Sequence, residues 1–148
     1  MTQDRTMAPA ITAARGRAPV PPIAELTRIE PVHLERLARQ GIFTTGLLLE
    51  VSETPTRRQT LADQVDASTN DVLRWRDEAL LLNLAGVGHA EHDLFAVAGV
   101  DGLAAILRVD LDTFRAAILR AASRLQVETP TDLVIETWWE QARTLHDQ

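Results

Sequence analysis

Two histidines three residues apart come nearest to a metal site in this sequence. His89 and His92 share one face of an expected helix, with Glu91 and Asp93 beside them. Imidazole suits zinc, nickel or copper, so the pair could form one edge of a site. A closed site needs further ligands, and the chain has only four histidines. We therefore favour a solvated polar helix start, with both carboxylates at the positive end of the helix dipole, and predict no metal and no cofactor.

Groups that could act as catalytic nucleophiles or bases are scarce. The chain has no cysteine, and all 15 basic residues are arginine. Thiol nucleophiles, iron–sulfur clusters, Schiff-base lysines and P-loops are therefore excluded. Ser68 resembles a helix cap, and no Ser–His–Asp order or paired-carboxylate motif is present. We predict that the protein is not an enzyme.

The three tryptophans could stack on a ligand or a base. Trp75 and Trp138 fall on the apolar stripes of expected helices, so we predict that both pack in the core. Trp139 lies about 100° around the helix from Trp138. It is therefore expected to be partly exposed and is the best single candidate for contact with a partner.

Charge is unevenly distributed along the 148 residues. The formal net charge is -6, but residues 1–22 hold three arginines and one aspartate. Residues 23–148 therefore form an acidic body, which suits neither general nucleic-acid binding nor an anionic membrane surface. The longest apolar run has five residues, so no segment is expected to span a membrane. These features are typical of a soluble, cytoplasmic protein.

The first 22 residues are rich in proline, alanine and arginine and end in Pro19, Pro21 and Pro22. Closely spaced prolines favour extended backbone. We predict a disordered leader over residues 1–22. The alternative is an arm that becomes ordered on an acidic partner.

From Ile23 onward, helix signals follow one another without the strict alternation of a half-buried strand. Expected helix starts occur at Pro31, Thr54-Pro55, Ser68 with Asp71, Asp110 and Thr129-Pro130. Gly41 is an expected helix stop. The sequence therefore predicts an all-α fold.

An internal repeat accompanies these signals. An offset of 58 residues aligns Leu37 with Phe95 and Gly41 with Gly99, and an offset of 63 aligns Trp75 with Trp138 and Ala79 with Ala142. The repeat predicts two similar halves, residues 23–79 and 80–148. Because the helices are short, we expect the halves to pack into one core.

The segment Leu84-Ala85-Gly86-Val87-Gly88 lies between two expected helices and resembles a helix-hairpin-helix motif. The resemblance implies that Val87 plugs the core and that free amides at the start of the following helix, near His89, can hold a phosphate.

The chain from about Ile23 to Leu145 resembles the bacterial and archaeal domain-of-unknown-function 4332 family. The resemblance rests on the glycine hairpin, Ala98-Gly99-Val100, Thr54-Pro55 with Arg58 and Leu61-Ala62, Trp75 with Ala79, and Trp138 with Ala142. It implies two helix-hairpin-helix-like repeats and assigns no function.

Two departures from the pattern argue against nucleic-acid binding. In the first half, Arg28 and Glu30 stand where the turn glycines would be. We expect the Glu30 carboxylate near those amides and infer a degenerate, structural hairpin. In the second half, the helix after the glycines has Glu91 and Asp93 but no arginine. Helix-hairpin-helix units that bind DNA usually have a basic side chain at this place.

These observations favour a non-catalytic helical adaptor that acts through protein–protein contacts. The candidate contact residues are Gly86, Val87, Gly88, His89 and Trp139. The alternative is a DNA- or RNA-associated module that contacts phosphate at Gly86-Val87-Gly88. The sequence leaves the partner and the oligomeric state open.

Overall fold

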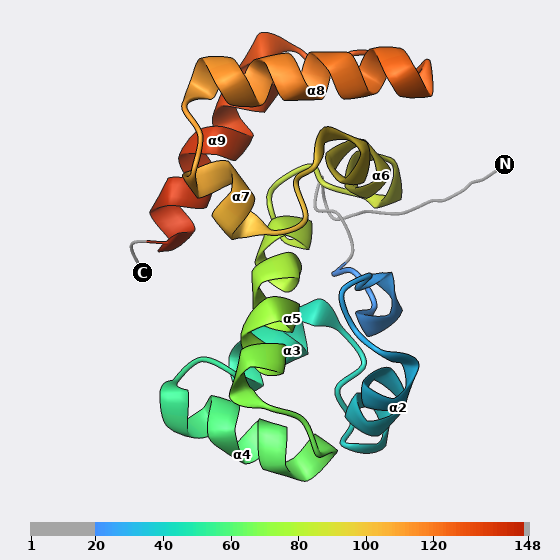
Figure 1. The fold of residues 1–148 in the computed structure, drawn as a ribbon, viewed down its shortest axis with the longest axis vertical. Coiled ribbons are helices and arrows are strands. Elements are labelled where there is room, and N and C mark those ends of the chain that lie inside the picture. Colours follow the sequence, from blue (N-terminus) through green and yellow to red (C-terminus); the bar gives the residue numbers. More distant parts are fainter. Residues whose placement is uncertain (1–19, 147–148) are drawn as a thin grey trace, which may run out of the picture.

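A computed structural model describes residues 20–146 of the chain (Figure 1). The predicted all-α fold is confirmed. The elements are η2 (Ile23–Glu25), α2 (Pro31–Arg39), α3 (Thr45–Val51), α4 (Pro55–Val65), α5 (Thr69–Leu82), α6 (His89–Ala98), α7 (Leu103–Leu107), α8 (Leu111–Leu125) and α9 (Asp132–His146). The described residues contain no β-strand, only an isolated antiparallel bridge between Pro22 and Thr44.

Most helices begin where the sequence predicts. The Thr54 side chain caps α4, and Pro55 occupies its first turn. Ser68 and Asp71 form the reciprocal capping box of α5. Asp110 caps α8 by accepting a hydrogen bond from the Thr113 amide.

The start predicted at Thr129-Pro130 was wrong. Helix α9 begins at Asp132, and the Thr131 hydroxyl accepts a hydrogen bond from the Val134 amide. Thr131 therefore caps the helix in place of Thr129, because its hydroxyl satisfies an amide of the first turn.

Helix α5 is the central element of the molecule (Figure 1). It packs against α3 and α4 at one end and against α7 at the other. In the second half, α6 packs on α8, and α9 packs on both α7 and α8. The boundary predicted between residues 79 and 80 lies inside α5, which ends at Leu82. The same helix therefore supports both groups of helices.

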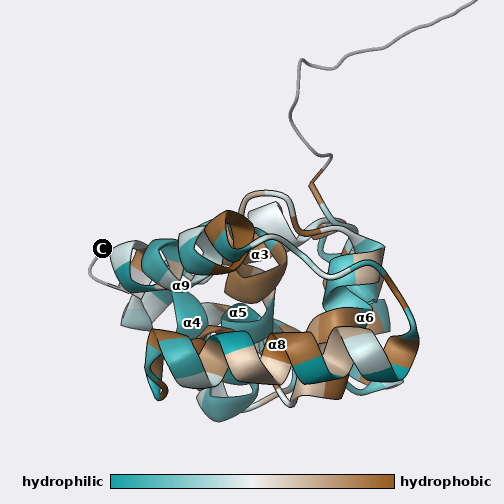
Figure 2. Cartoon of the chain, turned by 90° about the horizontal axis from the view of Figure 1, so that it is seen from above, coloured by the Kyte–Doolittle hydropathy of each residue, from teal (hydrophilic) through white to brown (hydrophobic). Residues whose placement is uncertain are grey.

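The core is one cluster to which both predicted halves contribute. Trp75 and Trp138 are 1% and 2% exposed, which confirms that both pack in the core. The rings of Phe95 and Trp138 meet edge to face with centroids 5.0 Å apart. Figure 2 shows hydrophilic and hydrophobic residues alternating along α8, as expected of a helix with one buried face.

The predicted leader falls mostly on residues 1–19, which lie outside the described residues. Its last residues are described and are hydrogen-bonded to the helical part. The Pro21 carbonyl accepts hydrogen bonds from the Thr45 amide at 2.9 Å and the Thr45 hydroxyl at 3.1 Å. The Ile23 amide donates to the Phe43 carbonyl at 2.9 Å. These bonds fix where the chain enters the fold.

No helix among the described residues has both the length and the apolarity that a bilayer crossing requires.

The C-cap of α8 allows a test of how a positive φ affects the stability of the fold. Gln126 has a φ of 57°, in the left-handed region that favours glycine. We expect Gln126→Gly to raise the free energy of unfolding by up to about 1 kcal/mol, measured by urea denaturation. Arg120→Gly, at an exposed position within α8, should lower it by about 1 kcal/mol. A destabilised Gln126→Gly chain would contradict this account.

Candidate functional site

The predicted hairpin connects α5 to α6. Gly86 has a φ of +79°, which glycine adopts without strain. Val87 is 4% exposed, so the predicted plug into the core is confirmed. Gly88 is the N-cap of α6. Local sequence therefore determines both the turn and the start of the next helix.

Most amides of this turn are already hydrogen-bonded within the chain. The Ala85 amide donates to Gln141 Oε1 at 2.9 Å, and the Val87 amide donates to the Leu84 carbonyl at 3.2 Å. The Gly88 amide donates to Glu91 Oε1 at 2.8 Å, which is one of the two bonds of a capping box, since Gly88 has no side chain to make the other. A phosphate would have to compete with the Glu91 carboxylate for the Gly88 amide.

His89 is exposed, but carboxylates already pair with its imidazole. Nδ1 lies 3.1 Å from Glu25 Oε1, and Nε2 lies 3.6 Å from Asp93 Oδ2. The hydrogen bond to Glu25, assisted by the charge of Asp93, raises the pKa of His89. The positive charge that His89 can carry is therefore directed toward groups of the same chain.

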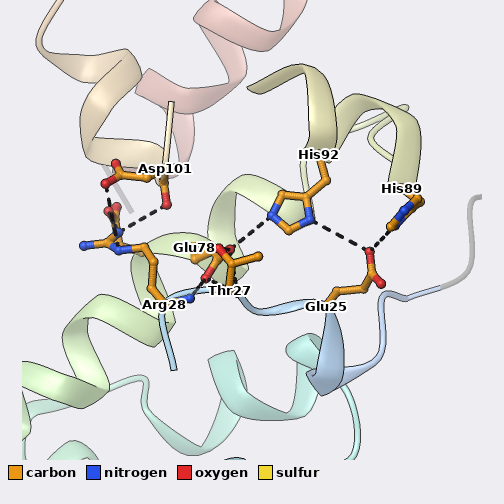
Figure 3. Close-up of polar contacts among 8 residues, drawn as sticks. Glu25, Thr27, Arg28, Glu78, His89, His92 and Asp101 are labelled. Atoms are coloured by element: carbon orange, nitrogen blue, oxygen red, sulfur yellow. Dashed lines mark hydrogen bonds and ion pairs between the residues drawn. The ribbon is translucent and has the colours of Figure 1, made fainter. Parts of the chain in front are cut away.

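The prediction of a solvated helix start was wrong for His92. This side chain is 7% exposed, and its Nε2 lies 3.1 Å from Glu78 Oε2 (Figure 3). Its Nδ1 lies 3.9 Å from Glu25 Oε1. The sequence predicts a polar helix start because His92 has charged neighbours on α6, but its partner is a buried glutamate on α5.

Glu78 is 1% exposed and is the centre of this network (Figure 3). Its carboxylate accepts hydrogen bonds from the Thr27 and Arg28 amides, each at 2.9 Å, and from the Thr27 hydroxyl at 2.7 Å. Burial opposes ionisation, but the bonds from His92, Thr27 and Arg28 outweigh it and lower the pKa of Glu78. Similarly, the bond to Glu78 raises the pKa of His92 against the opposing effect of burial.

The carboxylate at the first hairpin is therefore Glu78 and not Glu30, as the sequence led us to expect. Glu30 is exposed, is the N-cap of α2, and makes no capping bond with its side chain. The expectation failed because Glu30 is adjacent in sequence, whereas Glu78 approaches the amides from α5, some 51 residues further on.

Arg28 extends the network to the second half. Its Nη1 lies 3.0 Å from Asp77 Oδ2 and 3.2 Å from the Asp101 carbonyl. Asp77 Oδ1 also accepts a hydrogen bond from the Ala104 amide at 2.9 Å, near the start of α7. Arg28 and Asp77 thus join α5 to the loop before α7. No local pattern in the sequence indicates either role.

The two adjacent tryptophans of α9 donate to different loops. Trp138 Nε1 bonds the Ala85 carbonyl at 2.9 Å, which ties α9 to the hairpin. Trp139 is half-buried, in agreement with the predicted partial exposure. Its Nε1 donates to the Val109 carbonyl at 3.1 Å, and the Arg143 guanidinium lies 3.5 Å from its ring centroid. Contact between Trp139 and a partner stays a prediction.

A groove of about 640 Å³ opens beside the hairpin, and we call it the hairpin groove. Gly86 lines one wall, and Leu133 and Trp138 of α9 line another. Leu133 is 71% exposed, which is high for a leucine in a helix. Of the described residues that line the groove, the charged ones are Glu91 and Glu128. The lining therefore combines exposed apolar side chains, threonines and two carboxylates, and it includes no cationic side chain among the described residues.

No group of three or more His, Cys, Asp or Glu side chains among the described residues is arranged to hold a metal ion. His89 and His92 instead share the carboxylate of Glu25.

The network predicts a defined pH dependence of stability. Because the pKa of His92 is raised, its contribution is complete below its ordinary pKa of 6.5 and is lost as pH rises through the higher folded value. Because the pKa of Glu78 is lowered, its contribution is present above 4.5 and is lost as pH falls through the lower folded value. We expect the network to stabilise the fold most between pH 4.5 and 6.5.

Urea denaturation across pH 4 to 9 should measure this effect. His92→Gln should reduce the fall in stability above neutral pH, whereas His33→Gln, outside the network, should retain it. An unchanged pH profile for His92→Gln would show that the buried pair does not contribute.

A family model described as a domain of unknown function, DUF4332, matches residues 27–145. No curated protein and no solved structure matches the chain significantly. The match runs from the segment before α2 to the last turn of α9. The chain therefore belongs to the DUF4332 family.

Proposed function

We propose that this protein is a non-catalytic adaptor of the cytoplasm that binds another protein through its hairpin and the hairpin groove. The observation that carries the proposal is the occupation of the turn amides from within the chain. Gln141 accepts from the Ala85 amide, and Glu91 accepts from the Gly88 amide. Glu25 and Asp93 add negative charge around His89, where a phosphate would approach.

The two hairpins also support a shared scaffold. The Thr27 amide donates to Glu78, and the Ala85 amide donates to Gln141. Thr27 and Ala85 are related by the offset of 58, and Glu78 and Gln141 by the offset of 63. Both bonds thus join a hairpin to a helix in the same relative position. This correspondence supports two helix-hairpin-helix-like repeats in which a side chain of a later helix bonds an amide of each hairpin.

The hairpin groove provides the surface for a partner. Leu133 is 71% and Val134 is 39% exposed, although both are apolar. Exposed apolar side chains that line a groove with a polar edge are typical of protein–protein contact. Gly86 lines the groove directly, while Gly88 and His89 line a neighbouring cavity of about 280 Å³.

Affinity capture with the full chain tests this surface. We expect Leu133→Asn to lose a protein that the wild type retains, because a polar amide replaces the apolar contact. Leu73→Asn is the matched control, because Leu73 is also exposed but lies on α5, outside the groove. The lost protein should then bind the purified wild-type chain directly in calorimetry. If every captured protein binds both variants equally, the groove is not the partner site.

The alternative, a phosphate contact at Gly86-Val87-Gly88, requires a separate measurement. Fluorescence anisotropy with duplex DNA and with RNA should give dissociation constants weaker than about 10⁻⁴ M at physiological salt. Micromolar binding that falls steeply with salt would favour the alternative, provided that Gly86→Asp weakens it more than Gly86→Asn. Both substitutions meet the same positive φ and open space, so they differ mainly in charge.

A further inference from the structure

The hairpin groove has a chemistry that defines what can occupy it. Leu133 and Val134 offer exposed apolar surface, and Glu91 and Glu128 contribute the charged side chains of its lining. A peptide that fits must place apolar side chains against Leu133 and Val134 and cations near Glu91 and Glu128, because burying apolar area is favourable and carboxylates attract guanidinium groups.

The N-terminal residues of this chain have that composition. Met7-Ala8-Pro9-Ala10-Ile11 is uncharged and mostly apolar, and Arg15 and Arg17 follow it. No acidic residue lies between Met7 and Val20. The basic segment therefore complements the two carboxylates of the groove lining.

The place where this segment joins the fold is next to the same hairpin. Val20 lines a cavity of about 280 Å³ together with Val87, Gly88 and His89. Ala85 and Gly86, which precede Val87 in the same turn, line the hairpin groove. The chain thus enters the described fold beside one side of the hairpin, and the groove lies at the other.

The connecting length is sufficient. The three residues from Arg17 to Val20 can span about 10 Å when extended, and the nine from Ile11 to Val20 about 30 Å. A globular chain of this size has a radius of gyration of about 14 Å. The segment can therefore pass around the hairpin turn. Since it is tethered, its effective concentration at the groove is on the order of millimolar, so even weak contacts lead to occupancy.

We propose that residues 7–17 bind the hairpin groove of their own chain, with the segment Met7–Ile11 against Leu133 and Val134 and with Arg15 and Arg17 at Glu91 and Glu128. In this arrangement the segment competes with the partner for the groove, a consequence that rests on the proposed adaptor function. Because the attraction between arginine and glutamate is screened by salt, occupancy should fall as ionic strength rises.

The absence of cysteine allows a direct test on the full chain. A nitroxide attached to Ala10→Cys should broaden the amide NMR signals of Gly86, Leu133 and Val134, and reduction of the nitroxide should restore them. Signals of α4 should keep their intensity, because α4 packs against the end of α5 that lies away from the hairpin. Unchanged intensities at the groove would overturn the proposal.

A mixed sample distinguishes the occupant. When the nitroxide is on one chain and the isotope label on another, binding within one chain predicts no broadening at the groove. Broadening in the mixed sample would show that a second copy donates the segment and would overturn the assignment to the same chain.

Two sets of variants test the contacts. Leu133→Asn should abolish the broadening, whereas Leu73→Asn should retain it. Replacing Arg15→Glu together with Arg17→Glu should also abolish it by reversing the attraction to Glu91 and Glu128. Retained broadening in the Leu133→Asn chain would contradict the groove as the binding site.

The two proposals can fail separately. If the broadening is absent but a partner still depends on Leu133, the inference about the N-terminal segment is wrong and the adaptor function stands. If the broadening is present but no partner depends on Leu133, the segment binds the groove and the adaptor function is wrong.

Discussion

A buried carboxylate is the constraint on which the rest of this fold depends. An ionised glutamate away from water is costly unless hydrogen bonds and an opposite charge compensate it. Glu78 meets this requirement through the Thr27 and Arg28 amides, the Thr27 hydroxyl and His92. The segment before α2, the central helix α5 and the start of α6 must therefore be placed together. Replacing Glu78 by an apolar residue would leave the buried His92 and the Thr27 and Arg28 amides without this acceptor.

Gln141, which the offset of 63 residues relates to Glu78, is a neutral side chain. Gln141 accepts one bond from the Ala85 amide, and this bond is exposed. The first hairpin is enclosed by Glu78 and its partners, whereas the second borders the hairpin groove. This difference in burial and charge explains why we place partner contact at the second hairpin. The neutral amide needs no buried counter-charge, so the surrounding surface can stay open.

Arginine has a structural use that accounts for much of the basic charge. Guanidinium groups donate to carbonyls at or near the ends of short helices, through Arg36 to Val65, Arg58 to Ser52, Arg76 to Leu49, and Arg143 to Val109. A helix C-terminus leaves carbonyls without partners and carries partial negative charge, so a cation is favourable there. Arginine suits this role because its several donors can reach a carbonyl while the side chain stays partly exposed.

The sequence by itself determined the features that depend on near neighbours. Ser68 and Asp71 predicted a helix start because both partners of the capping box lie within one turn, and Gly86 predicted a turn because its backbone adopts positive φ freely. The apolar stripes likewise placed Trp75 and Trp138 in the core.

Only the tertiary structure decided the roles of Glu78, His92 and Arg28. Their partners lie on other elements, 51 residues apart for Glu78 and Thr27 and 73 apart for Arg28 and Asp101, and a charged residue in a helix ordinarily faces water. The sequence places such residues on a helix, but the packing of helices decides whether a carboxylate meets solvent or the amides of a distant loop.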